Sequence, residues 1–143
     1  MFTKQVSIFL ENKKGRLAEV TKLLTEGGIN IRALSLADMT DFGVLRLIVT
    51  DRPRCLQILK AKEFVVQETE VIAVEIEDRP GGLHRVLDVL EREAINIEYM
   101  YAFVEKSPKS AIVVFKIDGA ERAVEALSQN GIRTLPEDVV QNM

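Results

Sequence analysis

The sequence has few of the side chains that most often build reactive centres. Its 143 residues include one histidine, one cysteine and no tryptophan. A metal site built from several His and Cys ligands is therefore not expected within one chain, and no motif indicates a cofactor. The lone cysteine, Cys55, excludes an internal disulfide. Because disulfides are rare in reducing compartments, this cysteine usage favours a cytoplasmic protein.

The sequence also lacks a strong excess of charge and a long apolar segment. Its 19 Lys and Arg residues and 22 Asp and Glu residues give a net charge of −3, so the basic footprint of a nucleic-acid binder is missing. The N-terminus, Met1 to Lys4, leads into a strand pattern without the apolar stretch of a signal peptide or a membrane span. We therefore expect no direct nucleic-acid partner and no membrane association.

What the sequence does contain is an internal repeat. Residues 11–17 read ENKKGRL and residues 77–83 read EDRPGGL, so that Gly15 meets Gly81 at an offset of 66. The same offset aligns Asn30 with Asn96, each between two isoleucines. After residues 105–110 the offset becomes 68, because this turn-rich stretch holds two extra residues. Such persistent register indicates a duplicated structural unit.

Each repeat predicts the order βαββαβ, which is the ferredoxin-like α+β arrangement with an antiparallel sheet. In the first repeat we expect strands at 6–10, 29–37, 44–49 and 64–66, and helices at 17–24 and near 52–59. In the second we expect strands at 71–76, 96–104, 111–117 and 132–135, and helices at 83–92 and 120–129. We place the two domains at residues 1–68 and 69–143. No Gly, Pro or Ser run separates them, so strand should follow strand directly.

Both repeats place the pattern Asn/Asp–x–x–Gly–x–Leu between the first strand and the first helix, and Asn–Ile at the start of the second strand. Glycine at such a turn permits a positive φ or close backbone approach. The N–H groups that open the helix carry partial positive charge and can accept a carboxylate. An Asn or Asp beside the glycine can contact an ammonium or hydroxyl group. This pattern favours a small-ligand site.

With these two motifs the chain resembles the ACT domain family of small regulatory domains, as two tandem copies. The resemblance implies an amino acid bound between two ACT domains, in contact with the strand–helix loop of one and the second strand of the other. The positions that it assigns to ligand binding are Asn12, Gly15, Leu17, Asn30, Asp78, Gly81, Gly82, Leu83 and Asn96. The chain departs from the family at Lys14, where proline is usual and where the second repeat has Pro80.

A purely structural interpretation applies to several of these residues. The glycines are required by the turn with or without a ligand, and Leu17 and Leu83 suit a core. Asn30 and Asn96 can satisfy backbone groups at a strand start. Between the two repeats we favour the site with Asp78 over the site with Asn12, because a charge-assisted hydrogen bond to an ammonium group is stronger than a neutral one.

The sequence contains no nucleophile elbow, no phosphate-binding loop and no pair of carboxylates with a supporting histidine. We therefore expect a non-catalytic sensor of an amino acid or related metabolite, acting on a partner enzyme or pathway, and a homodimer. Two alternatives stay open. One is a regulatory subunit of an amino-acid biosynthetic enzyme, similar to the small subunit of acetolactate synthase. The other is a transcription-related regulator with tandem ACT domains.

Overall fold

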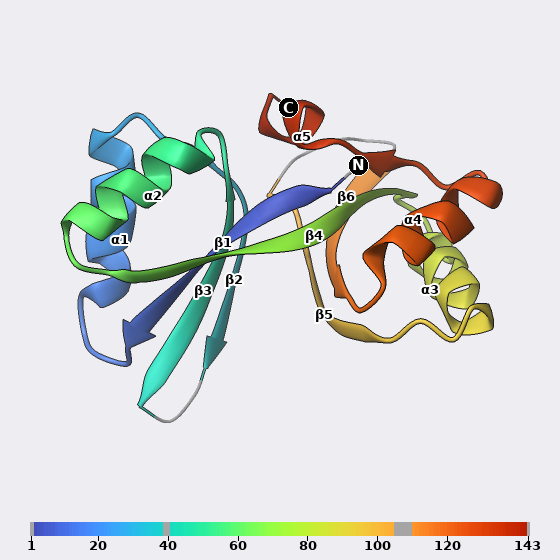
Figure 1. The fold of residues 1–143 in the computed structure, drawn as a ribbon, viewed down its shortest axis with the longest axis horizontal. Coiled ribbons are helices and arrows are strands. Elements are labelled where there is room, and N and C mark those ends of the chain that lie inside the picture. Colours follow the sequence, from blue (N-terminus) through green and yellow to red (C-terminus); the bar gives the residue numbers. More distant parts are fainter. Residues whose placement is uncertain (1, 39–40, 105–109, 143) are drawn as a thin grey trace. The chain divides into compact units, whose positions relative to one another are not determined.

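The computed structural model describes residues 2–38, 41–104 and 110–142 (Figure 1). These residues divide into two compact units. The N-terminal unit comprises Lys4–Thr69 together with Asn142. The C-terminal unit comprises residues 70–141 together with Phe2 and Thr3. Each unit has its own sheet order and its own apolar core.

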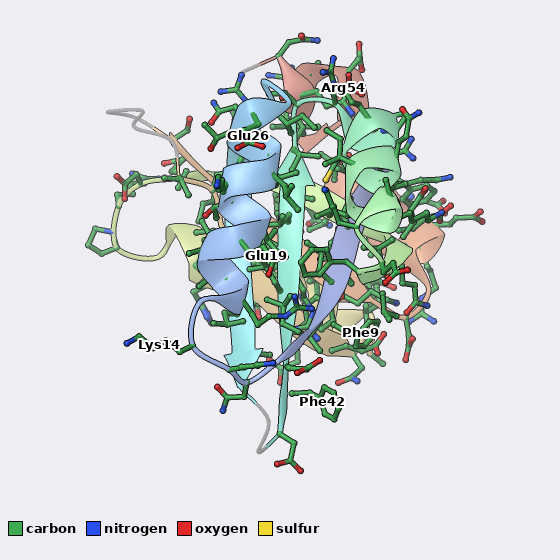
Figure 2. The ribbon with its side chains drawn as sticks, turned by 90° about the vertical axis from the view of Figure 1, so that its left-hand side faces the viewer. Phe9, Lys14, Glu19, Glu26, Phe42 and Arg54 are labelled. Atoms are coloured by element: carbon green, nitrogen blue, oxygen red, sulfur yellow. The ribbon has the colours of Figure 1, made fainter. Side chains whose placement is uncertain are left out.

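The N-terminal unit contains β1 (Thr3–Glu11), α1 (Arg16–Glu26), β2 (Ile31–Asp38), β3 (Phe42–Val49), α2 (Arg52–Ala61) and the first part of β4 (Val65–Glu77). Its strands are ordered β4–β1–β3–β2. The pairs β1–β3 and β2–β3 are antiparallel, and Leu45 faces both Ile8 and Leu36. The helices α1 and α2 lie side by side on one face of this sheet (Figure 2).

The C-terminal unit repeats this plan with the second part of β4, α3 (Gly82–Arg92), β5 (Ile97–Ala102), β6 (Ser110–Ile117), α4 (Ala120–Gln129) and β7 (Thr134–Leu135). Its strand order is β7–β4–β6–β5. Both second strands carry a β-bulge at the same place, between Ile31 and Ala33 and between Ile97 and Tyr99. The predicted βαββαβ order and the antiparallel α+β fold are thus confirmed in both repeats.

Several element boundaries differ from the expected ones, and the strands expected at 64–66 and 71–76 form the single strand β4 (Val65–Glu77). β3 begins at Phe42, two residues before the expected start at residue 44. Residues 39–40 and residues 105–109 of the insertion lie outside the described residues. β7 has two residues where four were expected. A last helix, α5 (Glu137–Gln141), was not expected, although Glu137 and Asp138 are suited to a first helical turn.

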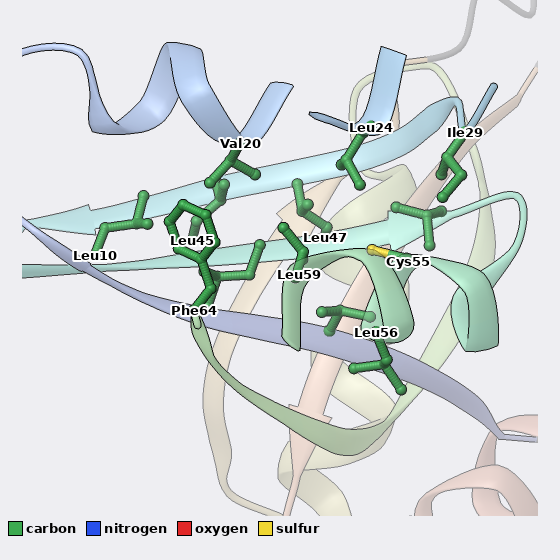
Figure 3. Packing of buried hydrophobic residues seen from close by; sticks show 13 residues of the cluster. Leu10, Val20, Leu24, Ile29, Leu45, Leu47, Cys55, Leu56, Leu59 and Phe64 are labelled. Carbon is green, nitrogen blue, oxygen red and sulfur yellow. The ribbon is translucent and has the colours of Figure 1, made fainter. Parts of the chain in front are cut away.

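The apolar alternation of β1 and the apolar stripes of α1 and α2 account for the core of the N-terminal unit. One face of β1 packs against the helices through Val6, Ile8 and Leu10. Leu24 of α1 and Leu59 of α2 belong to the same buried cluster. Figure 3 shows this cluster, with Cys55 and Leu56 contributed by α2. Burying one such side chain stabilises a fold by about 1.5 to 3 kcal/mol. The C-terminal unit has an equivalent core of buried residues.

The ends of the four long helices share one hydrogen-bond pattern. In α1 the N–H of Ile29 donates to the carbonyl of Leu24 at 2.9 Å and that of Gly28 to Thr25 at 3.0 Å, which is a Schellman motif. The left-handed residue of this motif is Gly28 in α1 and Gly131 in α4. It is Glu63 (φ 63°) after α2 and Ala94 (φ 55°) after α3. The first repeat therefore has glycine after its first helix, and the second repeat has glycine after its second helix.

The start of α2 agrees with the sequence, since Asp51 caps it by accepting a hydrogen bond of 3.1 Å from the N–H of Arg54. Pro53 lies in the first turn of this helix, where no N–H is needed. Among the described residues, no helix is long and apolar enough to cross a membrane.

Candidate functional site

The turns between the first strand and the first helix have the same backbone geometry in both units. Gly15 has a φ of 89° and Gly81 a φ of 91°, in the left-handed region that favours glycine. Gly15 accepts a hydrogen bond from the N–H of Glu19, and Gly81 accepts one from Arg85, each at 3.0 Å. Neither helix start has a side-chain cap. The N–H groups of Arg16 and Gly82 donate to the carbonyl oxygens of Lys13 and Arg79, so the next N–H groups of each first turn are the ones that suit a ligand.

In the N-terminal unit the residue after the glycine fills the space beside the turn. The guanidinium of Arg16 lies 4.5 Å above the ring centre of Phe64, and its Nη1 is 2.9 Å from Oε2 of Glu19. Figure 2 shows Glu19 on α1 and Lys14 in the turn before it. A separate cavity of about 90 Å³ lies beside this turn on the side of β2 and β3, since Leu36 and Gly43 line it whereas Glu19 and Phe64 do not. It is lined by Leu10, Glu11, Asn12, Lys13, Arg16, Leu17, Leu36 and Gly43.

In the C-terminal unit the same space is open. Gly82 stands where the first repeat has Arg16, and Ile132 stands where it has Phe64. An open cavity of about 570 Å³ results, a volume in the range of small-molecule sites. Its lining comprises Glu75, Ile76, Glu77, Arg79, Pro80, Gly81, Gly82, Arg85, Val86, Ser110, Gly131, Ile132 and Arg133.

Close backbone contact explains why position 82 is glycine. A Cβ atom built on Gly82 would lie 2.0 Å from the carbonyl oxygen of Glu77, well inside van der Waals contact. No such conflict exists at Gly81, where the positive φ is the reason for glycine. The pair of glycines therefore brings the start of α3 directly onto the end of β4.

A short fourth strand also opens this cavity. β7 pairs only with Ala73 and Val74 of β4, and the N–H of Glu75 then donates to the carbonyl of Arg133 at 3.0 Å. Within the described residues, no strand pairs with that edge of β4 beyond this point. In the N-terminal unit the corresponding edge of β1 lies beside the 13-residue β4. The length of the fourth strand thus decides how much of the sheet edge is accessible.

The walls of the larger cavity carry charges of both signs. Arg79 is ion-paired with Glu77, and Nη1 of Arg133 lies 3.7 Å from Oε2 of Glu75. Arg85 donates from Nη2 to the carbonyl oxygen of Asn130 at 2.6 Å. An environment that contains both guanidinium and carboxylate groups can bind both ends of a zwitterion.

The structure separates the residues that the motif assigns to ligand binding into two groups. Gly81 and Gly82 line the larger cavity, and Asn12 and Leu17 line the smaller one. Gly15, Asp78 and Leu83 belong to the same two turns, Asp78 exposed between the lining residues Glu77 and Arg79, and Leu83 against the core.

Asn30 and Asn96 lie at the other end of their units, at the start of β2 and β5, beyond the C-terminal end of the first helix. The side chain of Asn30 accepts a hydrogen bond from the N–H of Ile31 at 3.0 Å, and its own N–H donates to Oγ1 of Thr50. Within one unit, Asn30 therefore cannot share a ligand with Gly15, nor Asn96 with Gly81. A joint site of these residues requires two different units.

The motif alone did not identify the charged lining residues Arg79, Arg85 and Arg133. A signal for Arg85 and Arg133 exists in the alignment of the repeats. Arg85 occupies the position of Glu19 at an offset of 66, and Arg133 the position of Val65 at an offset of 68. A change of charge between otherwise matching repeats indicates where the two copies differ in function.

Two other polar features lie outside these cavities. Burial raises the pKa of the Cys55 thiol to about 12, so this buried side chain is protonated at neutral pH and is not a nucleophile. The hydrogen bond of 3.0 Å from Lys116 to Glu98 lowers the pKa of Glu98 and raises that of Lys116. Among the described residues, no three side chains of His, Cys, Asp or Glu form a metal-binding group.

The chain is similar to known proteins in both sequence and fold. The family described as an ACT domain pair matches residues 1–143. The solved structure of the protein BT0572 from Bacteroides thetaiotaomicron is 38% identical in sequence with a TM-score of 0.94, and the match covers 100% of this chain and 98% of that chain. The comparison with curated proteins gives no match.

More distant structures share the fold. The ligand-free regulatory subunit of aspartate kinase from Thermus thermophilus is 18% identical with a TM-score of 0.63, over 88% of this chain and 90% of that chain. The aspartate kinase of Clostridium acetobutylicum is 13% identical with a TM-score of 0.52, over 90% of this chain and 33% of that chain. At these identities the likeness concerns the fold alone.

Proposed function

This chain belongs to the ACT domain family, as a pair of ACT domains, and from that premise we propose that it binds an amino acid or a related small metabolite and regulates a partner enzyme or pathway. ACT domains are regulatory, so the proposed role is non-catalytic. The observation that carries the proposal is the cavity of about 570 Å³ at the strand–helix turn of the C-terminal unit. Its size and its mixed charges suit a zwitterionic ligand.

We assign partners in and beside this cavity to the carboxylate and ammonium groups of the proposed ligand. We assign the carboxylate to the N–H groups that open α3, next to Gly81 and Gly82, because the positive end of a helix dipole attracts an anion. We assign the ammonium group to Glu77 and Asp78, the first of which lines the cavity. Asn96 of another unit remains a proposed contact, since it lies far from the turn in its own unit.

We propose that the equivalent turn of the N-terminal unit, with Asn12, Gly15 and Leu17, does not bind the same ligand. The side chain of Arg16 on the ring of Phe64 fills the space that is open in the C-terminal unit. The separate cavity of about 90 Å³ on the β2 and β3 side of this turn is too small for an amino acid. One ligand per chain is the expected stoichiometry.

Regulation follows if the ligand prefers one arrangement of ACT domains over another, because a ligand shifts an equilibrium by its difference in affinity for the two states. We propose a homodimer as the setting for this shift. The edge strand β2 supports it, since Leu34 and Leu36 leave 45% and 52% of their surface exposed there. Unpaired strand edges and apolar surface are commonly covered by association.

The first experiment is thermal unfolding of the full chain with each common amino acid at millimolar concentration. A ligand at 100 times its dissociation constant stabilises the folded state by about 2.7 kcal/mol, which raises the unfolding midpoint measurably. A selective rise supports the proposal. If no amino acid raises the midpoint, the proposal of an amino-acid ligand is wrong. The same measurement with related metabolites then tests the rest of the proposal, and co-purification with an enzyme subunit tests the alternative of an obligate regulatory subunit.

Matched variants of the two repeats locate the site. Glu77→Gln and Asp78→Ala should weaken binding by tenfold or more, while Glu11→Gln and Asn12→Ala at the equivalent positions should leave it unchanged. Isothermal titration calorimetry gives both the affinity and the number of sites. Equal effects in the two repeats would refute the assignment to the C-terminal cavity.

A further inference from the structure

The charges of the C-terminal cavity do not balance. Three arginines and two glutamates line it, and each glutamate is ion-paired with one arginine, Glu77 with Arg79 and Glu75 with Arg133. Within residues 2–38, 41–104 and 110–142, no carboxylate is ion-paired with Arg85. One cationic side chain at the wall therefore has no anionic partner among these residues.

The position of Arg85 is fixed by the neighbouring helix. Its Nη2 donates to the carbonyl oxygen of Asn130, the residue that caps the C-terminus of α4. In return, Arg122 near the start of α4 donates to the carbonyl oxygen of Glu93 at the end of α3. Each of the two antiparallel helices therefore accepts, at its C-terminal end, a hydrogen bond from an arginine of the other. Because a guanidinium has five N–H donors, the bond to Asn130 leaves others for a ligand.

From these observations we propose that the C-terminal cavity selects an acidic amino acid, with its second carboxylate bound by Arg85, over the neutral amide of the same shape. The proposal rests on the proposed function and names its class of ligand. The α-carboxylate of the ligand binds the N–H groups at the start of α3, and the side-chain carboxylate binds the guanidinium of Arg85, one turn further along the same helix. Hydrogen bonds between guanidinium and carboxylate are charge-assisted and often bidentate, which a carboxamide cannot reproduce.

The N-terminal unit supports this assignment by contrast. It has Glu19 at the position of Arg85, and Glu19 is ion-paired with Arg16 at 2.9 Å. The charges of Arg16 and Glu19 therefore neutralise each other without a ligand. The second repeat has glycine in place of that arginine and arginine in place of that glutamate. The paired changes remove the ion pair that occupies this space in the first repeat, and they leave an open space in which one of three arginines is not ion-paired.

The test is calorimetric titration of the full chain with L-glutamate, L-aspartate, L-glutamine and L-asparagine. Each acid should bind at least tenfold more tightly than its amide. Arg85→Gln should lower the affinity for the acid to that of the amide and leave the affinity for the amide unchanged. Arg85→Lys, which keeps the charge, should retain part of the preference. Arg92→Gln on the same helix, outside the cavity, is the control and should behave as the native chain.

The ratio of the two affinities separates selection from damage to the fold, because a structural defect weakens both ligands alike. Equal binding of acid and amide by the native chain would overturn the proposal but leave the proposed function intact. An unchanged ratio in Arg85→Gln would remove Arg85 from the selection. Binding of neither acids nor amides, with binding of another amino acid, would overturn the proposal of an acidic ligand alone. Absence of binding by every amino acid would overturn the acidic ligand and also the amino-acid form of the proposed function.

Discussion

The two repeats share a fold, a strand–helix turn and a left-handed glycine, yet they differ at that turn in what occupies the adjoining space. In the N-terminal unit, Arg16 lies on Phe64 and pairs with Glu19. In the C-terminal unit, Gly82 and Ile132 leave about 570 Å³ open. The turn is therefore a requirement of the fold, and the residue after the glycine decides whether a cavity exists. After duplication, one copy can keep the structural role while the other is free to bind a ligand.

The strongest test of the equivalence of the two cores is truncation of matched leucines. Leu59 on α2 and Leu127 on α4 are both fully buried. Each change to alanine should lower the free energy of unfolding by about 2 to 5 kcal/mol, through lost burial and the cavity left behind. Urea denaturation measures the effect, and the exposed neighbours Lys60→Ala and Ser128→Ala are controls. A large effect in one repeat only would contradict the equivalence of the cores.

The next effect concerns the turn itself. Gly82→Ala should lower the free energy of unfolding by about 1 to 3 kcal/mol, because its Cβ would meet the carbonyl oxygen of Glu77 and force the backbone to move. Ligand affinity should fall with it, as the start of α3 shifts away. Arg16→Ala at the matched position loses the contact with Phe64, worth about 0.5 to 1 kcal/mol, and the surface ion pair with Glu19, worth about 0 to 1 kcal/mol. Native-like melting of Gly82→Ala would argue against the close contact.

A smaller effect is expected at the helix ends, where the repeats exchange their glycines. Ala94→Gly and Glu63→Gly should each raise the free energy of unfolding by about 0.5 to 1 kcal/mol, because a left-handed residue with a Cβ is strained and the relief exceeds the added entropy of the unfolded chain. Gly28→Ala and Gly131→Ala are the reciprocal changes and should destabilise the protein by about 1 kcal/mol. Thermal and urea unfolding check all four, and stabilisation by either alanine would refute the argument.

The smallest effect concerns pH. Lys116 holds the pKa of Glu98 below the ordinary value of 4.5, so the stabilisation from this carboxylate is present above that pH and is lost as the pH falls through the lowered pKa. The first repeat has Arg32 and Ile48 at these positions, without such a pair. Glu98→Gln should therefore flatten the acid branch of the stability curve, and Arg32→Gln should not. Urea midpoints between pH 3 and pH 7 measure the difference, and identical curves for the native chain and Glu98→Gln would contradict it.

Much of the fold could be predicted because it depends on local patterns. The alternation in β1, the stripe of Val20 and Leu24 on α1 and the cap at Asp51 are all set by neighbours within a few residues. The exceptions are weak local signals. β7 keeps only Thr134 and Leu135, and the short α5 has too few residues to show a period.

The candidate site could be predicted only in part. The glycines at 15 and 81 identify the turns, since a positive φ is a local property. Arg133 reaches the cavity from a segment some 50 residues further along the chain, and its place there follows from the path of the backbone after α4. Within one unit, the 11-residue helix α1 separates Asn30 from Gly15 by about 16 Å.

The sequence by itself determined the duplication, the order of elements and the two glycine turns, because periodicity and backbone preference act over short distances. Only the tertiary structure decided that one turn is filled and the other open. That outcome depends on Arg16 meeting Phe64, on Gly82 meeting Glu77, and on a fourth strand that ends after two residues. Side-chain volume and strand length act across the fold, so their combined result appears only when the elements are packed.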